Sequence, residues 1–131
     1  MGLLKFVFSE PAYVIRFPRP VRHIIAAGEQ LVVEEPLRKL LKNRRITLHN
    51  HYGPAETHVV TTFVMEPSGS IPELPPIGKP ISNTRIYILD ENKNVKPIGT
   101  IGELYIAGDS VGRGYSDNPQ LTHEKFLLVK N

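Results

Sequence analysis

The side chains with the clearest chemical potential lie in one short run, His49–His58, which reads HNHYGPAETH. If this run begins on a β-strand, His49 and His51 lie on the same face, because side chains alternate along a strand. Zinc accepts imidazole and carboxylate ligands, so this pair with Glu56 or His58 is a candidate zinc site. The signal is weak, because any two residues at this spacing share a strand face and the tighter His-Glu-x-x-His spacing is absent.

The same run also suits a nucleotide. Tyr52 offers a flat ring on which an adenine could stack, and Gly53-Pro54 forms a rigid turn whose backbone could approach a phosphate. Glu56 supplies a hard oxygen ligand of the kind that Mg²⁺ takes together with substrate phosphates. On these residues alone, a strand that runs through a turn into another strand is the simpler interpretation.

Two further motifs are better explained by turns. Gly108-Asp109-Ser110-Val111-Gly112 matches Gly-x-Ser-x-Gly, but a nucleophile elbow needs a helix after the serine, and Arg113-Gly114-Tyr115 disfavours one. Asp90–Asn94 begins like a calcium loop, but Val95 and Ile101 stand where glycine and glutamate are required. We therefore expect a tight loop in the first case and a hairpin turn in the second.

Hydrophobic patterning predicts a βαβ unit in the first half of the chain. The apolar run 21–27 predicts a buried strand that ends at Gly28. A helix is expected from Glu34-Glu35-Pro36 to about Asn43, because apolar residues follow at helical spacing, namely Leu37, Leu40 and Leu41. Residues 46–51 alternate as a second strand, and Val59–Met65 is expected to form a third. Strand, helix and strand in this order suggest a parallel pair with a crossover helix.

The second half has a different character. Residues 67–80 are rich in proline and glycine and predict a linker. Short strands are expected at 85–89 and 102–107, and a last helix begins after Asn118-Pro119. The predicted fold class is therefore α/β plus β, with a partial α/β subdomain at 1–66, the linker at 67–80, and a partial, small β-barrel-like subdomain at 81–131.

Composition narrows the function classes. The chain has 131 residues, no cysteine and a formal net charge of +3. Disulfides and thiolate metal sites are excluded, no apolar run approaches the length of a membrane span, and a cytoplasmic location is expected. The basic excess gathers at 38–45, which predicts the exposed face and last turn of a helix more readily than a nucleic-acid surface. We expect neither nucleic acid nor membrane as a partner.

Several motifs together resemble an adenylate-forming enzyme, specifically the adenylation (AMP-binding) domain of a nonribosomal peptide synthetase. The family's Asn-x-Tyr-Gly-Pro-Thr-Glu motif is matched by residues 50–56, and its Gly-Glu-Leu-x-Ile-x-Gly by 102–108, followed by Arg113-Gly114-Tyr115. The segments Pro76–Pro80 and Ala27-Gly28-Glu29 resemble the family's linking segment and adenine-flanking turn. The resemblance runs from about Val21 across nearly the whole chain.

The resemblance implies roles for individual residues. Tyr52 would stack on the adenine, Asn50 would bond its exocyclic amine, and Glu56 would hold Mg²⁺ against the phosphates. The implied ATP- or AMP-binding set is Ala27, Gly28, Glu29, Asn50, Tyr52, Gly53, Ala55 and Glu56. The implied substrate pocket is Ile25, Ala27, His51, Val59 and Val60. Ala55 stands where the family has a threonine, so a hydrogen bond to the α-phosphate is missing or comes from another group such as Thr57.

The resemblance also implies a reaction and its partners. A carboxylic acid, here an amino acid, is joined to ATP to give acyl-AMP and pyrophosphate, and the acyl group then passes to a phosphopantetheine thiol on a carrier protein domain among neighbouring synthetase modules. ATP and Mg²⁺ are the implied cofactors. The family's phosphate loop, ribose-binding aspartate and catalytic lysine do not appear, so the chain is expected to be an internal fragment with no catalytic residue and no adenylation activity of its own.

Two alternatives stay open. One is a non-catalytic relic or interaction fragment, and the other is a member of the same superfamily that activates a fatty or aryl acid. The identity of the acid, the final product and the oligomeric state do not follow from the sequence. Sheet edges left exposed in such a fragment are expected to favour self-association and poor solubility.

Overall fold

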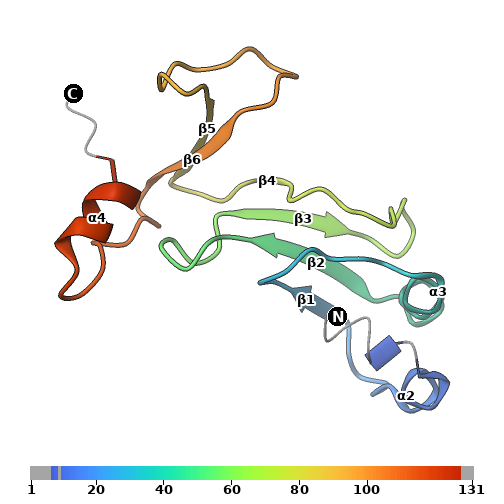
Figure 1. Ribbon diagram of the computed structural model, residues 1–131. Coiled ribbons are helices and arrows are strands. Elements are labelled where there is room, and N and C mark those ends of the chain that lie inside the picture. The colour runs from blue at the N-terminus through green and yellow to red at the C-terminus, as the bar shows by residue number, and fades with distance from the viewer. Residues whose placement is uncertain (1–6, 9, 128–131) are drawn as a thin grey trace.

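The computed structural model of the protein describes residues 7–8 and 10–127. Its elements follow the chain in the order α2 (Pro11–Arg16), β1 (His23–Ala26), α3 (Glu35–Arg44), β2 (Thr47–Tyr52), β3 (Thr61–Met65), β4 (Lys79–Pro80), β5 (Thr84–Leu89), β6 (Glu103–Gly108) and α4 (Pro119–Lys125). Figure 1 shows β1–β4 side by side, with β5, β6 and α4 beyond one end of that sheet.

The first four strands form one sheet in the order β1-β2-β3-β4. β1 and β2 are parallel, with His23 opposite Thr47 and Ala26 opposite Asn50, and α3 is the crossover between them. β3 returns antiparallel, with Leu48 opposite Met65. The predicted βαβ unit is therefore confirmed.

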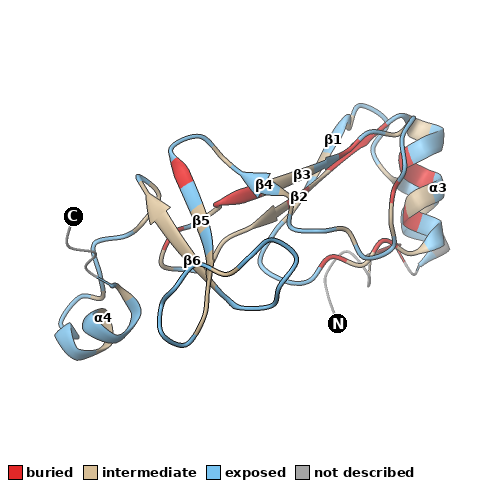
Figure 2. Cartoon of the chain, turned by 90° about the horizontal axis from the view of Figure 1, so that it is seen from above, coloured by how far each residue is buried: buried red, intermediate tan, exposed pale blue. Residues whose placement is uncertain are grey.

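The core lies where α3 packs against this sheet. Leu37, Leu40 and Leu41 are buried, as their spacing predicts, and they cluster with Ile46 and Leu48 from β2 and the segment before it. Pro36 at the first turn and Arg45 in the left-handed conformation after the last turn mark the helix ends. Figure 2 shows the buried positions on α3 and on the first sheet. All the buried hydrophobic residues of the described chain lie between Phe8 and Ile71.

The predicted linker, 67–80, lies against this first sheet. Its last two residues form β4, a strand that the sequence did not predict, which pairs antiparallel with β3. The amide of Val33 donates to the carbonyl of Glu73 at 2.8 Å, and Arg38 donates to the carbonyl of Ile71 at 3.0 Å. The subdomain boundaries predicted from composition stay a prediction, but this segment contributes backbone contacts to the α/β half.

β5 and β6 form a separate antiparallel sheet of two strands, with Thr84 opposite Gly108 and Leu89 opposite Glu103. Both strands lie within about a residue of the predicted ranges, and the turn at 90–94 is confirmed because the Asp90 side chain accepts from the amides of Asn92 and Asn94. The β-barrel-like form is not observed, since the described residues supply only this pair of strands. α4 begins as predicted, with the Asn118 side chain accepting from the Leu121 amide at 3.0 Å.

One expectation about burial is wrong. The strand predicted at 21–27 is observed at His23–Ala26, and its side chains alternate between exposed and half-buried, with Ile25 63% exposed. β1 is the edge strand of this sheet in the described chain, so no other described strand pairs with its outer side. Within the described residues, no helix combines the length and the apolar character that crossing a bilayer requires.

Candidate functional site

A cleft of about 520 Å³ lies over the ends of β1 and β2. Three separate parts of the chain line it: the loop after β1, the end of β2 with the turn that follows, and the segment leading to β4. The lining residues are Gly28, Glu29, Gln30, Leu31, Asn50, His51, Tyr52, Gly53, Pro54, Pro75, Pro76 and Ile77. The predicted adenine-flanking turn and the Asn-x-Tyr-Gly-Pro motif therefore meet at one site.

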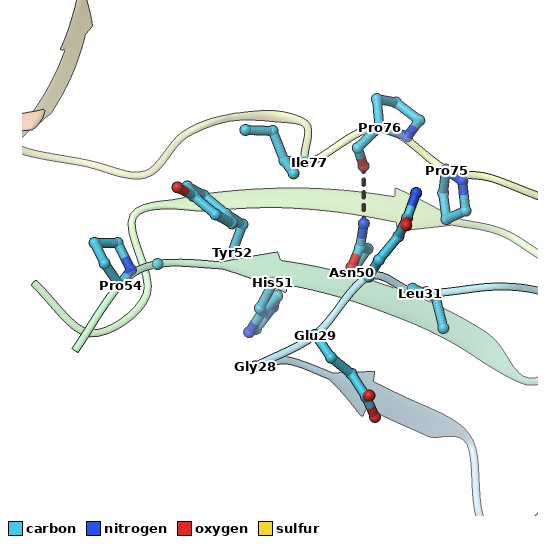
Figure 3. Close-up of a pocket in the computed structure, with 12 residues that line it drawn as sticks. Gly28, Glu29, Leu31, Asn50, His51, Tyr52, Pro54, Pro75, Pro76 and Ile77 are labelled. Carbon is cyan, nitrogen blue, oxygen red and sulfur yellow. Dashed lines mark hydrogen bonds between the residues drawn. The ribbon is translucent and has the colours of Figure 1, made fainter. Parts of the chain in front are cut away.

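Strand alternation separates the predicted roles within β2. Figure 3 shows Asn50 and Tyr52 on the side of β2 that faces Pro76 and Ile77, whereas His51 points to the opposite side. Asn50 is buried, and its Nδ2 donates to the carbonyl of Pro76 at 2.9 Å. This bond orients the side-chain amide of Asn50, which lines the cleft, and leaves its Oδ1 as a hydrogen-bond acceptor.

The turn after β2 requires glycine at position 53. A Cβ on Gly53 would lie 1.5 Å from the carbonyl oxygen of His58, so no other residue fits this close approach. The amide of Val60 donates to the carbonyl of Tyr52 at 2.8 Å and closes the loop. The Gly53-Pro54 pair thus folds the chain back so that β3 runs beside β2, which fixes where Tyr52 stands.

Glu56 does not line the cleft, and residues of the second half hold it. The hydroxyl of Tyr115 donates to its Oε1, and the amide of Gly112 donates to its backbone carbonyl at 2.8 Å. The Tyr115 hydroxyl is the main reason that the pKa of the Glu56 carboxyl is lowered, and the same bond raises the pKa of the Tyr115 phenol. Glu56 is therefore ionised at neutral pH, with one oxygen already bonded.

Several other predicted site residues do not line the cleft. Ala27 and Ala55 are exposed, Val59 is half-buried and Val60 is fully buried, and none of them lines the cleft, nor does Ile25. The hydroxyl of Thr57 is not available to replace the family's threonine, because it is buried in the turn and donates to the carbonyl of His58 at 3.1 Å.

The histidines form a cluster around His49. Its Nε2 lies 3.0 Å from Nδ1 of His23, and its ring centroid lies 6.1 Å from that of His51. Burial, followed by the nearby charges of His23 and His51, lowers the pKa of His49, and Glu66 acts in the opposite direction. His58 is exposed in the loop between β2 and β3, and among the described residues no group of three or more histidine or acidic side chains is arranged to hold a metal ion.

The Gly-x-Ser-x-Gly match has no nucleophile elbow. The Ser110 hydroxyl lies 3.2 Å from that of Thr84, and no helix follows it before α4 begins at Pro119. Gly108 has a φ of +117°, and a Cβ there would lie 2.0 Å from the carbonyl oxygen of Asn83, so the glycine serves a tight loop as predicted.

Some residues of the site were not predicted from the sequence. Pro75, Pro76 and Ile77 line the cleft through a segment that composition alone marks as a linker. In the sequence, Tyr115 is part of the Arg-Gly-Tyr motif only, and its bond to Glu56 joins residues 59 positions apart, which no local spacing reveals. The motif itself was the one available signal.

Comparison with known proteins agrees with the predicted resemblance. A family model for AMP-binding enzymes matches residues 4–116. The chain is 64% identical over 127 residues to tyrocidine synthase 2 of Brevibacillus parabrevis and 58% identical to gramicidin S synthase 2 of Brevibacillus brevis. These matches cover 97% of this chain but only 4% and 3% of the two relatives.

Solved structures show the same fold. The N-terminal subdomain of Klebsiella oxytoca NpsA in complex with 3-hydroxyanthranilyl-AMSN aligns with a TM-score of 0.63 at 27% identity, covering 82% of this chain and 26% of that one. The same subdomain in complex with 3-hydroxybenzoyl-AMSN aligns with a TM-score of 0.61 at 24% identity. The family match and the long, highly identical alignments agree, and we conclude that the chain belongs to the AMP-binding enzyme family, as a segment of a nonribosomal peptide synthetase adenylation domain.

Proposed function

We propose that this segment forms part of the site where ATP activates an amino acid. The carboxylate oxygen of the amino acid attacks the α-phosphorus of ATP, pyrophosphate leaves, and the acyl-AMP then gives its acyl group to a phosphopantetheine thiol with release of AMP. The observation that supports this best is the 520 Å³ cleft, because it joins the turn at Gly28 to the Asn50–Pro54 motif from distant parts of the sequence.

The purine is proposed to bind on the Asn50 and Tyr52 side of β2. The Tyr52 ring supplies a stacking face, and the backbone of Gly28 and Glu29 covers the other side. The bond from Asn50 Nδ2 to Pro76 leaves Oδ1 to accept a hydrogen bond from the exocyclic amine of adenine. Gly28 has a φ of +93° and nothing within 4 Å of a Cβ position, so its loop leaves room for a ligand.

Glu56 is proposed to bind the Mg²⁺ that accompanies ATP. Its chemistry fits the ion, since Mg²⁺ prefers hard carboxylate oxygens and the lowered pKa keeps Glu56 charged. Oε1 is held by Tyr115, which leaves Oε2 for the cation. When bound, Mg²⁺ would neutralise charge that develops on the phosphates.

The substrate pocket is proposed to include Ile25, Ala27, His51, Val59 and Val60, with His51 the member that lines the cleft. The names of the relatives, tyrocidine and gramicidin S synthases, favour an amino acid as substrate over an aryl or fatty acid. A carrier domain within neighbouring synthetase modules and a cytoplasmic setting, where ATP is available, complete the proposal. We further propose that β5 and β6 belong to a β-barrel-like subdomain in the whole domain.

A graft tests this function. Residues of this chain replace the matching 127-residue segment of the tyrocidine synthase 2 adenylation domain, and amino-acid-dependent exchange of pyrophosphate into ATP is measured. We expect the graft to catalyse exchange and Glu56→Gln to lose most of it. Glu91→Gln, a control at an exposed turn position, should keep the exchange rate of the unsubstituted graft.

The alternatives predict different results. A graft that melts like the parent domain but catalyses no exchange supports the relic interpretation and overturns the proposal. Exchange that depends on an aryl or fatty acid instead of an amino acid supports the other alternative. The 131-residue chain alone is expected to give no exchange, because the family's phosphate-binding and ribose-binding motifs are not among its residues.

A further inference from the structure

Glu56 is held at two points by the loop that follows β6. The hydroxyl of Tyr115 donates to the carboxylate Oε1, and the amide of Gly112 donates to the backbone carbonyl at 2.8 Å. Gly112 permits this approach, because a Cβ there would lie 2.8 Å from the Glu56 carbonyl oxygen. Backbone and side chain of one residue are thus fixed by two residues of a distant loop.

Tyr115 is itself fixed by α4. Its amide donates to Oγ1 of Thr122 at 2.9 Å, and Thr122 Oγ1 donates in turn to the carbonyl of Asn118 at 2.9 Å. The ring of Tyr115 meets the ring of Phe126 edge to face, with centroids 5.7 Å apart. The Asn118 side chain caps the same helix. The backbone and the ring of Tyr115 are therefore both held in place by α4 and the residue that follows it, and the phenol hydroxyl contacts Glu56 from this fixed position.

We propose that Tyr115 is the positioning residue for Glu56, selecting the orientation in which Oε2 meets a divalent cation. The inference rests on the proposed function, in which Glu56 binds Mg²⁺. A glutamate side chain loses considerable rotamer freedom when it is ordered. A neutral phenol donor lowers that cost at the moment of binding without supplying a positive charge that would repel the cation. Gly112 completes the arrangement by fixing the backbone from which the side chain extends.

The test compares Tyr115→Phe with Phe126→Leu in the full chain. The first variant removes only the hydroxyl and keeps the ring, whereas the second disturbs the ring packing and keeps the hydroxyl. The probe is Mn²⁺ with ATP, and bound Mn²⁺ is measured by electron paramagnetic resonance. We expect Tyr115→Phe to weaken Mn²⁺ binding by at least about tenfold, the lower end of the effect of one hydrogen bond to a charged group, and Phe126→Leu to have a smaller effect.

Glu56→Gln separates failure of this inference from failure of the proposed function. Loss of Mn²⁺ binding in Glu56→Gln with unchanged binding in Tyr115→Phe overturns the positioning role alone. Unchanged binding in Glu56→Gln overturns the metal role of Glu56 and the inference with it. Equal weakening in Tyr115→Phe and Phe126→Leu shows a structural effect and also overturns the positioning role.

The tyrocidine synthase 2 graft supplies a second readout. In Tyr115→Phe, the Mg²⁺ concentration that gives half-maximal exchange is expected to rise about tenfold, while the KM for the amino acid stays unchanged. A change of similar size in both quantities would mean that the variant disturbs the whole site, and would contradict a role confined to Glu56.

Discussion

At Gly53 the geometry allows one residue type, and this gives a sharp prediction. Gly53→Ala would place a methyl group 1.5 Å from a backbone oxygen of His58, whereas Gly69→Ala would meet its nearest atom at an ordinary 3.5 Å. We expect Gly53→Ala to lower the free energy of unfolding by about 1–3 kcal/mol, because the turn must open. Gly69→Ala should change stability by less than about 0.5 kcal/mol. Urea unfolding followed by circular dichroism measures both, and equal midpoints would contradict the steric argument.

His49 gives a prediction about pH. Its pKa is lowered in the fold from the ordinary value of 6.5, mainly through burial and then through the charges of His23 and His51. The neutral form is therefore favoured by folding, so its contribution to stability is complete above pH 6.5 and is lost as the pH falls through the lower, folded pKa. His49→Gln should lose less stability than the wild type between neutral and mildly acidic pH.

The measurement is the urea midpoint at low micromolar protein concentration, taken at a series of pH values. His58→Asn is the matched control, because His58 is exposed and has a φ of +60°, a conformation that asparagine tolerates. If His49→Gln and the wild type lose stability in parallel, folding does not lower the pKa of His49, and the prediction is wrong.

At the scale of elements, Arg38 joins the helix α3 to the segment before β4. Its guanidinium donates to the carbonyls of Ile71 and Val33, both at 3.0 Å, and its side chain is 25% exposed. Lys39, the next residue, is 70% exposed and lies 3.8 Å from Glu35. We expect Arg38→Met to cost about 2–3 kcal/mol, because two carbonyls lose charged donors, and Lys39→Met to cost under about 0.5 kcal/mol. Comparable thermal shifts in the two variants would be inconsistent with this bridging role.

This bridge also shows where sequence-based prediction stops. Leu37, Leu40 and Leu41 were placed correctly because an apolar face repeats at the period of the helix. The basic run at 38–45 was assigned to the exposed face, yet Arg38 turns inward to backbone carbonyls. Carbonyl groups are common to all residues, so a contact of this kind leaves no trace in residue types. The same reason explains why β4 was missed, since a strand of two residues within a proline-rich segment has no periodicity.

The candidate site also contains both residues that the sequence predicted and a contact that it did not. Gly28, Asn50, His51 and Tyr52 were predicted through motif resemblance, and the fold brings them to one cleft. The resemblance could not show that Glu56 lies outside the cleft lining and is bonded to Tyr115. That arrangement depends on how the two sheets meet, which is set by contacts between residues far apart in the chain.

The two sheets should differ in their resistance to local opening. All buried hydrophobic residues of the described chain lie between Phe8 and Ile71, and a hairpin of two strands is marginal without a packed face. We expect backbone amides in β2 and β3 to exchange with deuterium at least about tenfold more slowly than those in β5 and β6. Mass spectrometry of peptides covering each sheet checks this. Equal protection in both would indicate a cooperative unit that spans the two sheets.

At the scale of the whole molecule, exposed apolar surface and an open sheet edge determine how the chain behaves in solution. Ile25 on the edge strand β1 is 63% exposed, and Ile98 and Ile101 in the loop before β6 are 107% and 94% exposed. Among the described residues no strand pairs with the outer side of β1, and natural edge strands often oppose pairing with other chains by carrying charged residues, especially lysine. The sequence of β1, HIIA, carries no such charge.

We therefore expect the isolated 14.7 kDa chain to self-associate, with light scattering after size exclusion giving a mass above that of a monomer that rises with concentration. Ile25→Lys should restore the monomer, because a charge at the edge opposes strand pairing. Ile101→Lys is the matched comparison: if it restores the monomer and Ile25→Lys does not, association proceeds through the exposed loop and not through β1. A wild-type chain that stays monomeric at every concentration would contradict the prediction, because neither the edge of β1 nor the exposed loop would then drive association.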